Sequence, residues 1–175
     1  MAGLTSATAP EQMGVWKVYV YAFDGHGNAG IEQRSFRVVP PAVAGTNVAI
    51  GRPTTASTSQ TGGDGGPFTP GRATDGGFTS RWAGEWADAQ WIQVDLGVTV
   101  PIRYVQLGWE GAYGRAYRIE TSDDGSTWSS AYSTTSGDGG FDGIGLTASA
   151  RYVRVNLTRR GTAYGYSLWE FGVYR

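Results

Sequence analysis

The sequence alternates short β-patterned runs with turn-forming residues, and this punctuation constrains the fold more than any other feature. Residues 91–96 alternate apolar and polar side chains and then meet Gly97, as expected of a strand that ends in a turn. Gly contributes 28 of the 175 residues, and no stretch of useful length shows the apolar spacing of a helix. Short strands joined by Gly-rich turns predict an all-β sandwich or barrel.

The balance of charges excludes two classes of partner. The 14 Lys and Arg residues nearly match the 15 Asp and Glu residues, which leaves a formal net charge of −1. A nucleic-acid-binding surface needs clustered Lys and Arg, and an anionic membrane attracts polybasic segments. The sequence shows neither feature, and no apolar run approaches membrane-spanning length. We therefore expect no nucleic-acid partner and no membrane partner.

The sequence contains no cysteine. A domain of this size without disulfides needs another source of stability if it is extracellular, and composition alone does not assign the compartment. Small secreted domains usually rely on disulfides, and a larger core or a bound metal replaces them where they are missing. Without cysteine, thiol catalysis and Cys-ligated zinc are also excluded.

The pattern of the sequence changes near residue 47, and this change marks a domain boundary. Residues 1–13 are rich in Ala, Ser and Thr and are expected to be disordered. Residues 14–39 predict a β-hairpin, which is similar to the last two strands of an immunoglobulin-like or fibronectin-like domain. Residues 40–46 form a linker, and residues 47–175 form a self-contained domain. Because a lone hairpin is marginal in water and exposes strand edges, we expect it to dock against that domain or to pair with another copy.

Six runs in the larger domain are expected to be strands, and Gly-rich turns such as residues 137–140 separate them. Their order and spacing predict an antiparallel sandwich. The six runs are residues 91–96, 102–109, 116–121, 143–146, 152–157 and 168–174.

Seven short motifs occur in a characteristic order along the larger domain. They are residues 47–49 (NVA), 73–76 (ATDG), 80–82 (SRW), 91–97 (WIQVDLG), 117–125 (YRIETSDDG), 151–154 (RYVR) and 168–171 (LWEF). With these motifs the domain resembles the discoidin domain (coagulation factor V/VIII C-type) and is similar to family 32 carbohydrate-binding modules. The resemblance implies a discoidin-type antiparallel jelly-roll β-sandwich, here preceded by a short β-hairpin.

Two further segments, residues 109–117 and 164–170, are similar to a subgroup attached to bacterial enzymes that degrade chitosan, β-1,3-glucan and α-1,3-glucan. The resemblance therefore implies a secreted, monomeric, non-catalytic carbohydrate-binding module. Its polysaccharide ligand would be chitosan or a 1,3-linked glucan. Its other partner would be the catalytic domain of a parent bacterial enzyme.

The resemblance also implies a structural calcium ion that ties a loop to the C-terminal strand. Carried over position by position, its ligands are the side chains of Asp75, Ser80 and Glu170 and backbone carbonyls near Arg72 and Gly77. Calcium accepts roughly six to eight such oxygen ligands in flexible geometry. The alternative is a metal-free turn in which Asp75 caps backbone N–H groups.

Three polar loops are candidates for sugar binding, because a sugar site combines exposed aromatic rings with fixed polar groups. In the discoidin fold these loops gather at one end, and in chitosan-binding relatives the positions of Glu85 and Glu110 contact the sugar. A pair of carboxylates favours a cationic aminosugar. Arg81 could instead brace the calcium loop, and the carboxylates could be solvated. The candidates are Arg81, Glu85 and Trp86, then Glu110 and Tyr113, then Arg160, Tyr164 and Tyr166.

The remaining tryptophans are expected to serve mainly the core. Trp82, Trp91 and Trp128 lie inside strand motifs, which favours burial, and Trp109 and Trp169 are more readily core residues than ligand platforms.

Two other classes of function use the same kinds of residue. A cell-surface or protein adhesion domain of discoidin type would share the fold, but residues 58–67 lack the apolar spikes of its membrane-binding members. A glycoside hydrolase needs two carboxylates across an enclosed cleft. The single histidine, His26, lies in the hairpin turn and completes no catalytic arrangement in the domain. We therefore predict a binding module and not an enzyme.

Overall fold

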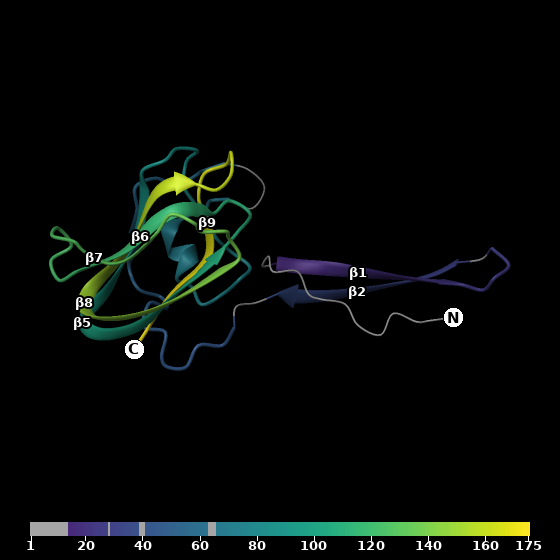
Figure 1. Ribbon diagram of the computed structural model, residues 1–175, viewed down its shortest axis with the longest axis horizontal. Coiled ribbons are helices and arrows are strands. Elements are labelled where there is room, and N and C mark those ends of the chain that lie inside the picture. Colours follow the sequence, from purple (N-terminus) through teal and green to yellow (C-terminus); the bar gives the residue numbers. More distant parts are fainter. Residues whose placement is uncertain (1–13, 28, 39–40, 63–65) are drawn as a thin grey trace.

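The computed structural model describes residues 14–27, 29–38, 41–62 and 66–175, so the segment 1–13 that we expected to be disordered lies outside the described residues, as do residues 39 and 40. Strands β1 (Gly14–Phe23) and β2 (Ala29–Val38) pair along their whole length as one antiparallel hairpin. The hairpin projects away from the larger domain (Figure 1), which differs from the docking that we expected. Pairing with another copy stays a prediction.

The larger domain is built on one seven-stranded antiparallel sheet in the order β4-β9-β5-β8-β6-β7, with β3 paired to β5. A 3-10 turn, η1 (Pro70–Ala73), precedes β4. The strands are β3 (Thr54–Ala56), β4 (Trp82–Ala83), β5 (Gln90–Trp109), β6 (Gly114–Ser122), β7 (Ser129–Thr134), β8 (Phe141–Arg160) and β9 (Ser167–Tyr174).

Strands β5 and β8 are 20 residues long, and each bends from one layer of the sandwich into the other. Residue Gln90 at the start of β5 pairs with Leu157, whereas Trp109 at its end pairs with Leu168 in β9. The pairing register shifts after Asp95, beside Gly97 with a φ of +85°. We had predicted two strands where β5 runs and two where β8 runs. Pairing continues through the corner, so each pair is one bent strand.

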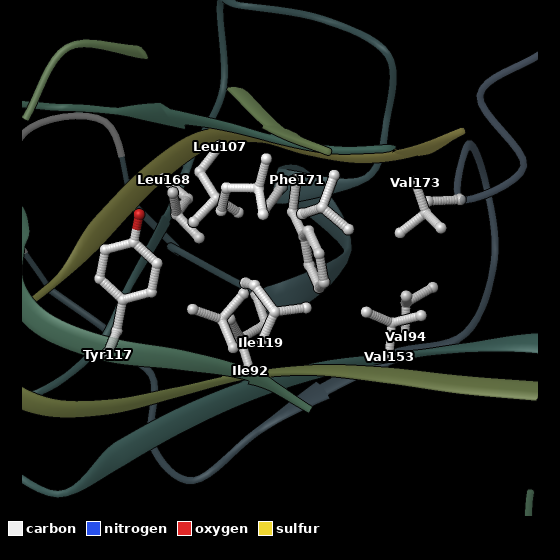
Figure 2. Close-up of a cluster of buried hydrophobic side chains, with 14 of the residues drawn as sticks. Ile92, Val94, Leu107, Tyr117, Ile119, Val153, Leu168, Phe171 and Val173 are labelled. Atoms are coloured by element: carbon white, nitrogen blue, oxygen red, sulfur yellow. The ribbon is translucent and has the colours of Figure 1, made fainter. Parts of the chain in front are cut away.

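The core lies between the two layers that this bending creates. Figure 2 shows Leu107, Leu168, Phe171 and Val173 on one side facing Ile92, Val94, Ile119 and Val153 on the other, all of them buried. The antiparallel all-β sandwich is therefore confirmed. Among the described residues, none forms an α-helix, and no helix there is suited in length and apolarity to crossing a bilayer.

The burial of the tryptophan side chains agrees only in part with our expectation. Trp82 and Trp109 are buried as predicted, but Trp91 and Trp128 are only half-buried, so their assignment to the core is wrong. Trp91 alternates with the buried residue Ile92 along β5 and therefore lies on the outer face. Trp128 packs against Arg154, whose guanidinium lies 3.9 Å from the indole centroid.

Candidate functional site

Four loops gather at one end of the sandwich because β5 and β8 begin and end there. They are residues 84–89, 110–113, 135–140 and 161–166. Backbone hydrogen bonds join them: Gly161 N donates to Tyr113 O over 2.8 Å, and Gly84 N donates to Tyr166 O over 2.9 Å. The approach is so close that a Cβ on Gly165 would lie 2.4 Å from Gly84 O. This end of the molecule is therefore a set of mutually braced loops.

A pocket of about 260 Å³ opens among these loops. Five of the eight predicted sugar-binding residues line it, namely Arg81, Trp86, Glu110, Tyr164 and Tyr166. The other lining residues are Gln60, Ala83, Ala112, Gly165 and Ser167. The fold thus brings together residues that lie more than 80 positions apart in the sequence.

Two aromatic side chains stand on the rim of this pocket. Trp86 is 62% exposed and Tyr164 is 59% exposed, and their rings meet edge to face with centroids 5.6 Å apart. Tyr166, which is fully buried, differs from this pair: its hydroxyl donates to Asp88 Oδ1 over 3.2 Å, and burial raises its pKa well above the usual value. Trp86 and Tyr164 therefore supply the accessible apolar surface, and Tyr166 supplies part of the wall.

The polar members of the pocket are fixed by neighbouring groups. Arg81 Nη1 donates to Ser167 Oγ over 2.7 Å, and its guanidinium lies 4.0 Å from the ring centroid of Phe68. Glu110 Oε2 accepts a hydrogen bond from Ala112 N over 3.1 Å. These contacts hold a cation and a carboxylate in place before any ligand arrives, which reduces the entropy lost on binding.

The other three predicted residues lie beside the pocket rather than in it. Glu85 is exposed next to Trp86, and its backbone N–H donates to Thr58 Oγ1 over 3.0 Å. Tyr113 lines a smaller neighbouring pocket. Arg160 donates hydrogen bonds to Asp88 and to backbone carbonyls of the neighbouring loop.

Arg160 and Asp88 connect two of the four loops. The Asp88 carboxylate accepts from Arg160 N over 2.9 Å and from Arg160 Nε over 3.2 Å, and these bonds lower the Asp88 pKa, the backbone one most. Arg160 Nη1 also donates to the carbonyl oxygens of Ala163 and Tyr164. These contacts join the loop that carries Tyr164 to the loop that carries Trp86, and the assignment of Arg160 to sugar binding stays a prediction.

The loop that was expected to bind calcium is closed by its own side chains. Asp75 Oδ1 accepts from Gly77 N over 2.8 Å, as in the metal-free alternative, and Asp75 Oδ2 accepts from the hydroxyl of Ser80. Arg72 belongs to the neighbouring turn η1, where its N–H donates to Thr69 O over 3.1 Å.

Glu170 brings a second carboxylate toward this loop from β9. It is 2% exposed, Asn47 Nδ2 donates to its Oε1 over 3.4 Å, and no hydrogen-bond partner for Oε2 is found within the described residues. Burial, reinforced by the charge of Asp75, raises the pKa of Glu170 to about 8, and the backbone N–H of Gly76 and the side chain of Asn47 act in the opposite direction. A buried carboxylate oxygen without a donor fits a cation-binding position.

The described part of the chain contains no cluster of three or more His, Cys, Asp and Glu residues arranged to hold a metal. A cation between Asp75 and Glu170 would therefore also depend on the Ser80 hydroxyl and on backbone carbonyl oxygens, as Ca²⁺ sites commonly do.

Sequence reasoning missed two residues that the structure places at the sugar-binding candidates. Gln60 lines the main pocket and donates through Nε2 to Gly84 O over 2.9 Å. It lies in residues 58–67, which we had considered only for membrane contacts. Asp88 was missed because nothing in the sequence pairs it with Arg160, 72 positions away.

Comparison with known proteins adds independent information. The F5/8 type C domain family model matches residues 53–171. No match is found among curated proteins. Chitosan-binding module 1 from a chitosanase/glucanase of Paenibacillus sp. IK-5 is 47% identical, over 74% of this chain and 99% of that chain, with a TM-score of 0.69.

Module 2 of the same enzyme, solved with chitotriose, is 46% identical over 74% of this chain and 100% of that chain, with a TM-score of 0.69. A CBM32 domain from Clostridium perfringens, 18% identical over 70% of this chain and 94% of that chain with a TM-score of 0.63, supports the fold alone. The closely similar structures are binding modules, in agreement with the prediction of a binding module and not an enzyme. Since the family model spans well over half of the residues, the resemblance is confirmed, and the chain belongs to the F5/8 type C (discoidin) domain family.

Proposed function

We propose that this chain is a non-catalytic carbohydrate-binding module that attaches a secreted polysaccharide-degrading enzyme to chitosan. The observation that carries the proposal is the position of the Glu110 carboxylate in the same pocket as the exposed pair Trp86 and Tyr164. The 46% identity to a module solved with chitotriose supports the choice of ligand. A 1,3-linked glucan is the neutral alternative.

The pocket matches the chemistry of an aminosugar in two ways. The apolar face of a sugar ring packs against an aromatic plane, and Trp86 and Tyr164 offer that plane. The ammonium group of glucosamine donates charge-assisted hydrogen bonds to carboxylates. Glu110 lines the pocket together with these rings, and Glu85 is exposed next to Trp86 in the chain. Each site is weak because sugar hydroxyls exchange water for protein, and multivalency along the polymer compensates.

We further propose that Ca²⁺ binds between Asp75 and Glu170 and stabilises the fold in place of a disulfide. The unpartnered, buried Oε2 of Glu170 supports this assignment. Ser80 and backbone carbonyls near Arg72 and Gly77 would complete the oxygen ligands. The ion would have a structural role, since Glu170 lies on β9 and not in the loops that form the sugar pocket.

Calorimetric titration with glucosamine oligomers, N-acetylglucosamine oligomers, laminarin and α-1,3-glucan oligomers tests the proposed ligand. We expect binding to the glucosamine oligomers and a loss of roughly tenfold in affinity in Glu110→Gln, the usual effect of removing a charge-assisted hydrogen bond. Glu32→Gln on the exposed hairpin is the matched control and should bind as the wild type does.

Two results would contradict the proposal. Equal affinity for glucosamine and N-acetylglucosamine oligomers would show that charge is not recognised. Binding to none of these sugars by a folded protein would remove the carbohydrate function, and with it the role in attaching an enzyme to its substrate.

A further inference from the structure

We propose that a second, smaller pocket beside the first is an additional subsite for a cationic aminosugar unit, so that one chitosan chain spans both. This inference rests on the proposed function. The second pocket has a volume of about 160 Å³, and Tyr113, Asp138, Trp109 and Trp169 are among its lining residues. Nothing in the sequence had marked Asp138 or the loop that carries it as part of a binding site.

Glu110 connects the two pockets. It lines the main pocket together with Trp86 and Tyr164, and it lines the second pocket together with Tyr113 and Asp138. A single carboxylate shared by two neighbouring hollows places them within reach of one oligosaccharide. A polymer held at both pockets loses its translational freedom only once, so the second contact adds affinity efficiently.

Charge distinguishes the second pocket from the first. Arg81 lines the main pocket, whereas among the described residues that line the second pocket the charged side chains are the carboxylates of Glu110 and Asp138. Two guanidinium groups lie near this pocket and make other contacts: Arg115 Nη1 donates to Gly137 O over 3.3 Å, and Arg81, which donates to Ser167 Oγ, lies 5.9 Å from the Trp169 ring centroid. The two lining carboxylates attract an ammonium group more strongly than they attract a neutral hydroxyl group. The second pocket therefore favours the ammonium group of glucosamine over the acetamide of its acetylated form.

The aromatic wall of the second pocket is fixed before a ligand binds. The Tyr113 ring lies against two glycines: a Cβ on Gly161 would lie 2.1 Å from Tyr113 Cε2, and a Cβ on Gly139 would lie 3.0 Å from Tyr113 Cδ1. Gly139 also has a φ of +87°, which side-chain-bearing residues rarely adopt. Two loops thus hold the ring in one position, as a preorganised sugar-binding surface requires.

Trp169 forms part of the wall of the second pocket. The residue is half-buried and lines the second pocket, and its indole Nε1 is buried without a hydrogen-bond partner in the described ranges. A buried N–H group without an acceptor is unfavourable and uncommon. Because Nε1 has almost no accessible surface, we assign Trp169 to the wall of the pocket and not to hydrogen bonding with a ligand.

Titration of the wild type and Asp138→Asn with glucosamine di-, tri-, tetra- and pentasaccharides tests the subsite. We expect the wild-type affinity to increase with chain length until both pockets are filled. In Asp138→Asn the disaccharide should bind nearly normally, while the longer oligomers should lose roughly three- to tenfold, as for a partly exposed charge-assisted hydrogen bond. Asp123→Asn, which lies on another surface of the sandwich, is the matched control.

The outcomes separate this inference from the proposed function. Wild-type binding that depends on length but is identical in Asp138→Asn would overturn the subsite and leave the main pocket intact. An equal loss for N-acetylated oligomers would overturn the assignment of the second pocket to an ammonium group. Absence of wild-type binding to every oligomer would instead overturn the proposed function.

Discussion

The hairpin and the sandwich are built from similar β-forming residues, yet their aromatic side chains have opposite surroundings. Tyr19, Tyr21 and Phe23 in the hairpin are 48%, 56% and 59% exposed, whereas Tyr117 and Phe171 in the sandwich are at most 1% exposed. Apolar surface contributes roughly 25 cal/mol for each Å² that is removed from water. The comparison shows that β-patterning produces strands in both regions, but only a second facing layer turns those strands into a core.

The ion pairs of the hairpin are also more exposed to solvent than those of the sandwich, as one pair from each region shows. The pair between Glu32 and Arg34 in the hairpin is largely exposed, with side chains 62% and 79% accessible. In the sandwich, Arg151 makes two hydrogen bonds of 2.8 Å to the two carboxylate oxygens of Asp95, whose side chain is 24% accessible. A bidentate, partly buried pair is more stabilising than an exposed one.

The largest expected effect comes from removing one matched aromatic ring from each region. Phe171→Ala should lower the free energy of unfolding by about 3–5 kcal/mol, because it empties a fully buried site between two layers. Phe23→Ala should change it by less than about 0.5 kcal/mol, as for an exposed surface residue. Denaturant unfolding followed by tryptophan fluorescence measures both values. Similar losses in the two variants would show that the hairpin is packed against something in solution.

Calcium removal should affect the sandwich by a somewhat smaller amount. If Ca²⁺ is present at about a hundred times its dissociation constant, chelation should lower the free energy of unfolding by about 2.7 kcal/mol. The unfolding free energy of Glu170→Gln should change little when Ca²⁺ is added, because this variant lacks one of the two carboxylates proposed to bind the ion. Thermal unfolding with Ca²⁺ and with a chelator gives the comparison, and Glu32→Gln serves as the control.

An unchanged melting temperature of the wild type on chelation would contradict the calcium proposal. It would favour the metal-free turn, in which Asp75 is satisfied by Gly77 and Ser80.

The features of the two regions that depend on local sequence pattern could be predicted from the sequence. Alternation around residues 91–96 and the motifs of the family led to the sandwich and to the loops that form the pocket. Burial of each aromatic was harder to predict, because it depends on register. Trp91 and Ile92 are neighbours with opposite exposure, and Tyr164 and Tyr166 flank one glycine but only Tyr164 reaches the surface.

Long-range polar contacts left no local signal at all. Arg160 is bound to Asp88, and Asp138 lines the second pocket together with Glu110. Each of these relations joins segments that the bending of β5 and β8 brings to one end of the molecule. No spacing rule within either segment could reveal them.

The stability of the protein at acid pH should depend on the ion pair between Asp95 and Arg151 and not on the pair between Glu32 and Arg34, and the effect should be smaller than that of calcium removal. Hydrogen bonds from Arg151 lower the pKa of Asp95 to about 2, below the value of about 3.9 for an unfolded Asp. A depressed folded-state pKa contributes stability that is present above about pH 4 and is lost as the pH falls toward 2. Asp95→Asn should therefore lose about 1 kcal/mol at neutral pH and show a flatter decline between pH 4 and pH 2.

The matched change Glu32→Gln in the hairpin should leave the acid unfolding curve of the sandwich unaltered. Circular dichroism across this pH range compares the two variants. A curve for Asp95→Asn that coincides with the wild type would show that other carboxylates govern acid unfolding.

The smallest expected effect is that of removing the hairpin altogether. A chain that begins at residue 42 should lose no more than about 1 kcal/mol of the unfolding free energy of the sandwich and should retain its affinity for glucosamine oligomers. Two observations support this: within the described residues β1 pairs only with β2, and the similar chitosan-binding modules are matched over 99–100% of their length by about 74% of this chain. One contact argues the other way, since Gln106 Nε2 donates to Pro41 O over 3.0 Å, and truncation would remove that acceptor. A neutral hydrogen bond of this kind contributes about 1 kcal/mol. A loss much larger than that would mean that the hairpin packs on the sandwich in solution, and the contrast between the two regions would no longer hold.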